Sequence, residues 1–308
     1  MRHVVFALSV VLLVAACSSV GAARGSDAPG SLPPVTSAQP APIAPTAGAS
    51  TESPSAAPTR EPIPTPGPGL ARLEPDDGAY FGLNLDWGTE TALEATQRLG
   101  RTPAVWVQFA RFPLDAGSRG NLDSFVEQVA DVGGLALITL EPHDGLAAVT
   151  DDAAIELADL LASYWTDYGV RSFVRFAHEM NGSWYPWAQQ PTAYVAAFRR
   201  VAKAVHERSP GSAMIAADPR SAAGRIFDTD GDGSITKADD PYAPYYPGDT
   251  AVDWIGVSLY HWGREYPWGE NEVPEPGAFE ALIRGTVTGS HKDGVEIPDL
   301  YAVYAEGH

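Results

Sequence analysis

Short apolar runs alternate with longer amphipathic stretches along the chain from Ala79 onward. Short apolar runs are typical of strands buried on both faces, and apolar residues three and four positions apart are typical of helices that pack on one side. We therefore expect strands at 80–84, 104–109, 135–140, 172–176, 213–217, 254–258 and 300–305. We expect helices at 90–99, 122–130, 152–168, 193–207 and 278–284.

The alternation of strands with helices predicts an α/β fold built on a parallel sheet. We expect a TIM (β/α)8-type barrel and not a doubly wound sheet, partly because no Gly-x-Gly-x-x-Gly turn follows the first strand. A barrel of this type closes with eight strands, and only about seven are expected before the chain ends at His308. We therefore expect a barrel that is incomplete at its C-terminus, as in a truncated chain.

The first 17 residues have the pattern of an export signal. A positively charged start is followed by an apolar run at 4–14 and by small residues directly before Cys17, which resembles a bacterial lipobox. The run is shorter than the roughly 20 residues that a membrane span needs. We expect a lipid on Cys17 that anchors the protein to the cell envelope, outside the cytoplasm. The alternative is an ordinary secretory signal with an incidental cysteine, which also implies export.

Residues 18–72 are dominated by Pro, Ala, Ser, Thr and Gly, so we expect a disordered linker there. The rest, 73–308, is rich enough in aromatic and aliphatic residues to form one large domain, the expected barrel. Because Cys17 is the single cysteine, the chain has no intrachain disulfide. We expect a monomer.

The formal net charge of −19 narrows the class of partner. This charge argues against nucleic acid, because phosphate contacts need Lys or Arg, and the chain has 20 of these against 39 Asp and Glu. A neutral polysaccharide is compatible with an acidic surface, since it is recognised through stacking on aromatic rings and hydrogen bonds to hydroxyls. No organic cofactor is indicated.

The most informative segment is 175–187, where the fourth expected strand ends and its loop begins. Active sites of barrels lie at that end of the strands. Cleavage of a glycosidic bond needs an acid that protonates the leaving oxygen, and Glu179 lies among aromatic residues that suit this role. Arg175 and His178 are suited to orienting carboxylates. The alternative is a structural polar cluster under a loop.

Three further residues of this segment suit sugar binding. Trp184 and Trp187 offer flat apolar faces for sugar rings, and Asn181 can donate to a hydroxyl. The whole run, Arg-x-x-His-Glu-Met-Asn-Gly with Trp five residues after Glu179, resembles the acid/base motif of glycoside hydrolase family 26. That family comprises β-mannanases, β-1,3-xylanases and mixed-linkage glucanases.

The resemblance implies an acid/base glutamate after strand four, which matches Glu179, and a nucleophilic glutamate at strand seven. Glu306 follows the apolar run at 300–305 and is the candidate nucleophile, although a solvated glutamate near the chain end is the alternative. By the same resemblance Tyr260 holds the nucleophile and His143 lies in a subsite. Trp262 is expected to be a sugar platform.

A separate motif at 228–239 indicates calcium. Oxygen-bearing side chains stand at the spacing of an EF-hand loop, with glycine at its sixth position. The last ligand position carries aspartate where glutamate is usual. We expect a structural Ca²⁺ site, against the alternative of a solvated acidic loop. The expected ligands are Asp228, Asp230, Asp232, Ser234, Thr236 and Asp239.

Together these features predict a retaining, endo-acting hydrolase of a β-linked polysaccharide, with β-1,4-mannan as the expected substrate. β-1,3-Xylan and mixed-linkage glucan are alternatives within the same family. A transglycosylase with the same carboxylates is another alternative. A non-catalytic surface protein that binds carbohydrate on an incomplete barrel is the alternative from a different class.

Overall fold

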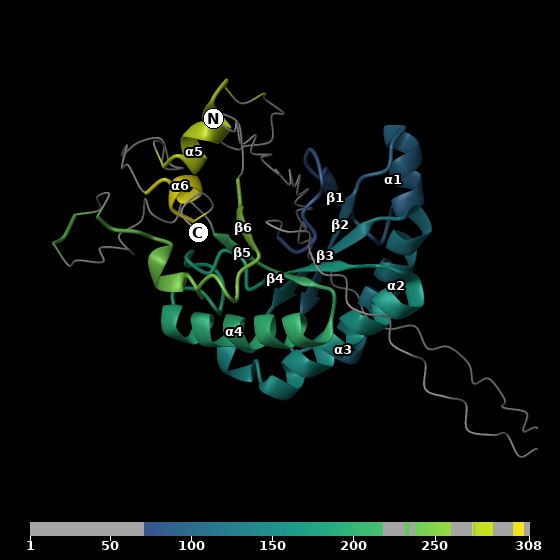
Figure 1. Cartoon of the computed structure of the whole chain (residues 1–308), viewed down its shortest axis with the longest axis horizontal. Coiled ribbons are helices and arrows are strands. Elements are labelled where there is room, and N and C mark those ends of the chain that lie inside the picture. The colour runs from purple at the N-terminus through teal and green to yellow at the C-terminus, as the bar shows by residue number, and fades with distance from the viewer. Residues whose placement is uncertain are drawn as a thin grey trace, which may run out of the picture. The chain divides into compact units, whose positions relative to one another are not determined.

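The computed structural model describes residues 71–217, 232–234, 238–259, 273, 275–285 and 298–304. Its centre is a parallel sheet of six strands in which each strand pairs with the next one along the chain (Figure 1). All six coincide with expected strands, which confirms those predictions. The strands are β1 (Gly82–Asn84), β2 (Val105–Arg111), β3 (Leu135–Glu141), β4 (Ser172–Phe176), β5 (Ser212–Ala217) and β6 (Trp254–Val257).

Helices follow each of the first four strands and cover the sheet (Figure 1). The sheet is curled, so the described part is an incomplete α/β barrel of the TIM type, as expected. The five expected helices are confirmed. The helices are α1 (Ala92–Leu99), α2 (Ala116–Val132), α3 (Asp151–Tyr168), α4 (Pro191–Arg208), α5 (Ala278–Ile283) and α6 (Leu300–Tyr304), with short 3₁₀ turns η1 (Leu146–Ala148) and η3 (Ala243–Tyr245).

Helix α2 begins six residues before the expected start at 122. Its first turn has no apolar periodicity, but the side chain of Asp115 accepts a hydrogen bond from the N–H of Ser118 at 2.7 Å. An aspartate at this position satisfies a backbone donor that the helix itself leaves unpaired. The cap therefore extends the helix beyond the amphipathic stretch.

The seventh expected strand, 300–305, is wrong, because its residues 300–304 form α6. Asp299 caps the helix by accepting from the N–H of Ala302 at 2.8 Å. The helix buries its first and last residues, which lie four positions apart, and leaves Val303 41% exposed. A short apolar run does not distinguish the helical period from the strand period, and the capping aspartate was the missed signal.

The sheet is buried on both faces, which explains the nearly continuous apolar strands. One face packs against the helices through residues such as Trp106, Ile138 and Val174. The opposite, inner face carries a second cluster that includes Val105 and Phe173. Strand side chains alternate between the faces, so neighbouring positions in one strand serve different clusters.

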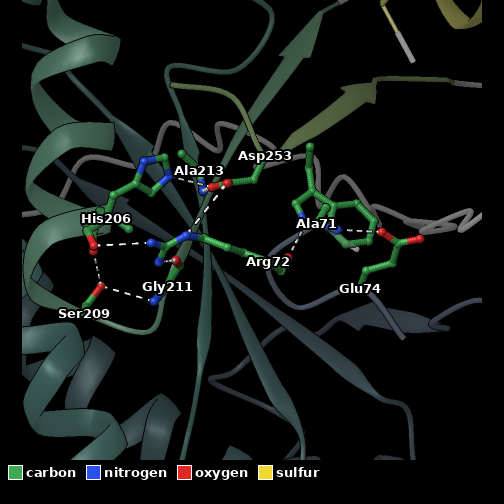
Figure 2. Close-up of polar contacts among 10 residues, drawn as sticks. Ala71, Arg72, Glu74, His206, Ser209, Gly211, Ala213 and Asp253 are labelled. Carbon is green, nitrogen blue, oxygen red and sulfur yellow. Dashed lines mark hydrogen bonds and ion pairs between the residues drawn. The ribbon is translucent and has the colours of Figure 1, made fainter. Parts of the chain in front are cut away.

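Residues 71–74 form a strap at the N-terminal end of the inner face. Leu73 is 8% exposed within the inner cluster. The guanidinium of Arg72 donates to the carbonyls of His206 and Gly211, at 3.3 Å each (Figure 2). The indole of Trp254 donates to the Arg72 carbonyl at 2.6 Å. The strap thus connects the chain before β1 to the α4–β5 loop and to β6.

Among the described residues, none of the helices combines the length and apolar character of a membrane span. The expected signal segment, Cys17 and nearly all of the expected linker lie outside the described residues. Their assignment stays a prediction.

Candidate active site

The inner face becomes polar toward the C-terminal ends of the strands. Phe109, Thr139 and Arg175 are paired in register on β2, β3 and β4. The Nε of Arg175 donates to the hydroxyl of Thr139 at 2.8 Å, and its guanidinium carbon lies 5.3 Å from the centroid of the Phe109 ring. Arg175 is only 7% exposed. This layer therefore holds a buried positive charge in a fixed orientation beneath the strand ends.

Glu141, the last residue of β3, adds a carboxylate two positions beyond Thr139 on the same strand. Burial raises its pKa, and the nearby His143 and Arg175 oppose that shift. The Nε2 of His143 lies 3.4 Å from a Glu141 carboxylate oxygen. Sequence reasoning missed Glu141 as a site residue. The available signal was its place in the inward-facing series Leu137, Thr139, Glu141.

Glu179 lies in a tight turn directly after β4. Ala177 and Glu179 both have left-handed backbones, with φ of 47° and 53°. A non-glycine residue adopts this conformation at a cost of about 1 kcal/mol, so the surroundings must impose it. The N–H of Glu179 donates to the carbonyl of Ala216 on β5 at 2.6 Å. The turn is thereby fixed to the neighbouring strand, and the Glu179 side chain is 4% exposed.

Trp184 contacts the carboxylate of Glu179. Its indole Nε1 donates to Oε2 of Glu179 at 2.8 Å, while half of Trp184 is exposed. The structure thus brings together the predicted acid and one predicted sugar platform. An exposed aromatic face thus lies beside a buried carboxyl group, which is compatible with sugar binding next to an acid.

His178 belongs to an aromatic wall beside this carboxylate. Its Nε2 is 3.0 Å from the hydroxyl of Tyr185, and Tyr185 stacks on Trp187 with ring centroids 4.4 Å apart. Burial, together with the nearby charges of Arg175 and His143, lowers the pKa of His178 to about 3. His178 is therefore neutral at physiological pH. Its Nδ1 is buried and has no hydrogen-bond partner within the described part of the chain.

Two predicted sugar contacts differ from expectation. Trp187 is fully buried, with its indole donating to the carbonyl of His178 at 2.9 Å. Asn181 is also fully buried. Neither presents a face to solvent, so Trp187 supports the wall through its stack on Tyr185 and is not a platform. Sequence spacing marked both residues, but it did not predict the fold of the loop that buries them.

His143 lies at the edge of the same wall. Its ring centroid is 5.3 Å from that of Trp187, and 40% of its side chain is exposed. The structure therefore brings His143 together with the predicted site. Tyr260, Trp262 and Glu306 lie outside the described residues, so their roles stay predictions.

The expected calcium loop is described only in part. Asp228, Asp230 and Thr236 lie outside the described residues. Asp232 and Ser234 are exposed, whereas Asp239 is 1% exposed. Within the described ranges, no group of three or more His, Cys, Asp or Glu side chains is placed to hold a metal ion.

Comparison with known proteins shows sequence similarity to an endoglucanase. No family model matches the chain. Endoglucanase H of Acetivibrio thermocellus is 27% identical over 203 residues, which are 62% of this chain and 20% of that protein. The chain thus spans about a fifth of the length of this relative.

Several solved structures are also similar. An endo-β-1,4-mannanase double mutant of Cellulomonas fimi is 16% identical with a TM-score of 0.44, over 59% of this chain and 48% of that one. A family 26 endo-β-1,4-mannanase of Bacillus sp. JAMB-750 is 20% identical with a TM-score of 0.40, over 55% and 50%. A family 18 chitinase of Pseudoalteromonas aurantia is 12% identical with a TM-score of 0.39, over 71% and 77%.

Proposed function

We propose that this chain is an endo-acting glycoside hydrolase that cleaves β-linked polysaccharide with retention of configuration. The observation that carries the proposal is Glu179, a buried glutamate that a left-handed turn holds at the C-terminal edge of a parallel sheet. Such strained positions cluster at active sites, and barrel enzymes have their catalytic groups at this edge. The similarity to Endoglucanase H supports the same class of reaction.

Glu179 would act first as the acid and then as the base. In the first step, a second carboxylate attacks the anomeric carbon while Glu179 gives its proton to the leaving oxygen, which keeps the electron pair of the broken bond. In the second step, water gives a proton to Glu179 and attacks the same carbon, and the second carboxylate leaves. We propose Glu306 as that carboxylate, on the resemblance of its sequence context alone.

Arg175, on β4 just before the turn, and His178, next to Glu179 in the turn, support this chemistry. The fixed charge of Arg175 favours ionised carboxylates at the strand ends. His178 is neutral, so it holds Tyr185 through its hydrogen bond without placing a competing positive charge beside Glu179.

We propose β-1,4-mannan as the substrate, because the segment 175–187 resembles the motif of a family best known for β-mannanases. Mixed-linkage β-glucan is the second candidate, since the similar curated sequence is named an endoglucanase. β-1,3-Xylan is the third.

The test is an assay of the full chain on mannan, lichenan and β-1,3-xylan with product analysis by chromatography. Glu179→Ala should lower the rate on the cleaved glycan by about 10²- to 10⁴-fold, the usual contribution of a general acid. Glu156→Ala is the matched control, because Glu156 lies on α3 in a surface ion pair with Arg119. Binding without hydrolysis by the wild type would instead favour a non-catalytic carbohydrate-binding protein.

We further propose that the protein is exported and held at the cell envelope by a lipid on Cys17, and that it acts as a monomer. Residues 1–17 support export, and the Pro-rich segment 18–72 suits a tether. We also propose that 228–239 binds a structural Ca²⁺, on the spacing of its oxygen ligands.

A further inference from the structure

The hydrogen bond between Trp184 and Glu179 distinguishes the two oxygens of the carboxyl group. The indole N–H occupies Oε2 at 2.8 Å. In a protonated carboxyl group, the carbonyl oxygen is a good acceptor, and the hydroxyl oxygen is a poor one. A fixed N–H donor at Oε2 therefore favours the form of the acid in which the proton is on Oε1.

Gly182 makes this arrangement possible. A Cβ added at Gly182 would lie 2.6–2.8 Å from three atoms of the six-membered ring of Trp184, closer than real side chains approach. The indole thus lies directly against the backbone at this glycine. The N–H of Gly182 also donates to the carbonyl of Glu179 at 2.9 Å, which closes the turn. One short loop therefore holds the acid Glu179, the donor Trp184, and Gly182, whose missing side chain leaves room for the indole.

We propose that Trp184 is a positioning residue that places the catalytic proton on Oε1 of Glu179, and that Gly182 is the residue that lets its indole reach Oε2. This inference rests on the proposed hydrolase function and specifies the geometry of its acid. The exposed half of Trp184 leaves the indole face open beside the carboxyl group, so the donor also borders the space that the sugar enters.

The proposal defines the proton transfer. As the bond between the anomeric carbon and the leaving oxygen breaks, the O–H bond at Oε1 breaks and an O–H bond forms on the leaving oxygen. Glu179 becomes a carboxylate, and the indole N–H stabilises the new charge because hydrogen bonds to ionised acceptors are stronger than those to neutral ones. In the second step, a proton from water returns to Oε1.

The kinetic test uses two variants and two leaving groups. Trp184→Phe keeps a ring but removes the donor, and Gly182→Ala displaces the indole. Each is assayed on a phenyl and a dinitrophenyl glycoside of the disaccharide unit that the wild type cleaves. Phenolate needs the acid, whereas dinitrophenolate leaves without a proton. We expect kcat/KM on the phenyl glycoside to fall about 10- to 100-fold, and on the dinitrophenyl glycoside to stay unchanged.

Gly120→Ala is the matched control for the glycine variant, because an added Cβ there meets no atom within 4 Å. Equal losses on both glycosides would overturn the proposal, since they would make Trp184 a sugar platform only. Unchanged kinetics on both would overturn it as well.

A second measurement does not depend on activity. The indole ¹⁵N–¹H signal of Trp184 is identified by its absence in Trp184→Phe. In spectra recorded at a pH where the carboxyl group is ionised, the indole donates to a charged acceptor in the wild type and to a neutral amide in Glu179→Gln, so we expect this signal to move upfield in the variant. A signal that stays in place would overturn the inference even if the wild type is an active hydrolase. A signal that moves in Glu179→Gln, together with a wild type that cleaves no glycan, would instead show that the hydrogen bond exists and that the proposed function has failed.

Discussion

The strap at 71–74 predicts that a residue far from the candidate active site stabilises the whole domain. Arg72→Ala removes two hydrogen bonds to the carbonyls of His206 and Gly211 and a contact of 4.0 Å with the carboxylate of Asp253 (Figure 2). The partners belong to the end of α4, the loop that follows it and the residue before β6. Without Arg72, carbonyls at the end of α4 lose donors in a partly buried region.

The size of the effect follows from these contacts. Both hydrogen bonds are long at 3.3 Å, so each contributes about 1 kcal/mol even though the donor is charged. The ion pair adds at most about 0.5 kcal/mol, because it is long and partly exposed. The free energy of unfolding should therefore fall by about 2 kcal/mol, which lowers the Tm of a domain of this size by about 4–8 °C.

The assay is thermal unfolding followed by circular dichroism, with urea unfolding as a check. Arg119→Ala is the control, since its ion pair with Glu156 joins side chains that are 41% and 56% exposed. That variant should lose less than about 1 kcal/mol. If Arg72→Ala and Arg119→Ala had the same small effect, the strap would not be part of the cooperative unit, and the reasoning from its contacts would be refuted.

Two further predictions concern protons and calcium. The pKa of His178 is lowered to about 3 from 6.5, so between these values the unfolded chain binds a proton that the folded chain does not. The free energy of unfolding should fall as pH drops below 6.5, by about 2 kcal/mol at pH 5 from this group, and urea unfolding of His178→Gln should show a weaker dependence on pH. Equal pH slopes would contradict this. Removing calcium with a chelator should lower the Tm by a few degrees, and Ca²⁺ but not Mg²⁺ should restore it, because the expected loop suits the larger ion. An unchanged Tm, together with no heat of Ca²⁺ binding in calorimetry, would rule out the site.

The sequence by itself determined the order of the first six strands and of the helices between them. Parallel strands buried on both faces are apolar along their whole length, and the helices between them have apolar residues on one side, so two local patterns sufficed. The segment 300–305 showed neither of these two patterns clearly. It was too short to show a period, and residues 300–304 form α6, which Asp299 caps.

The sequence also marked Glu179 as the candidate acid, because it is a carboxyl group among aromatic residues directly after an expected strand, in a segment that resembles a known acid/base motif. Only the tertiary structure showed that Trp187 is buried and that Trp184 donates to one oxygen of Glu179. These facts depend on the register between strands and on a left-handed turn fixed to β5. Such contacts join residues through the packing of the sheet, and a linear pattern of residue types carries no information on that packing.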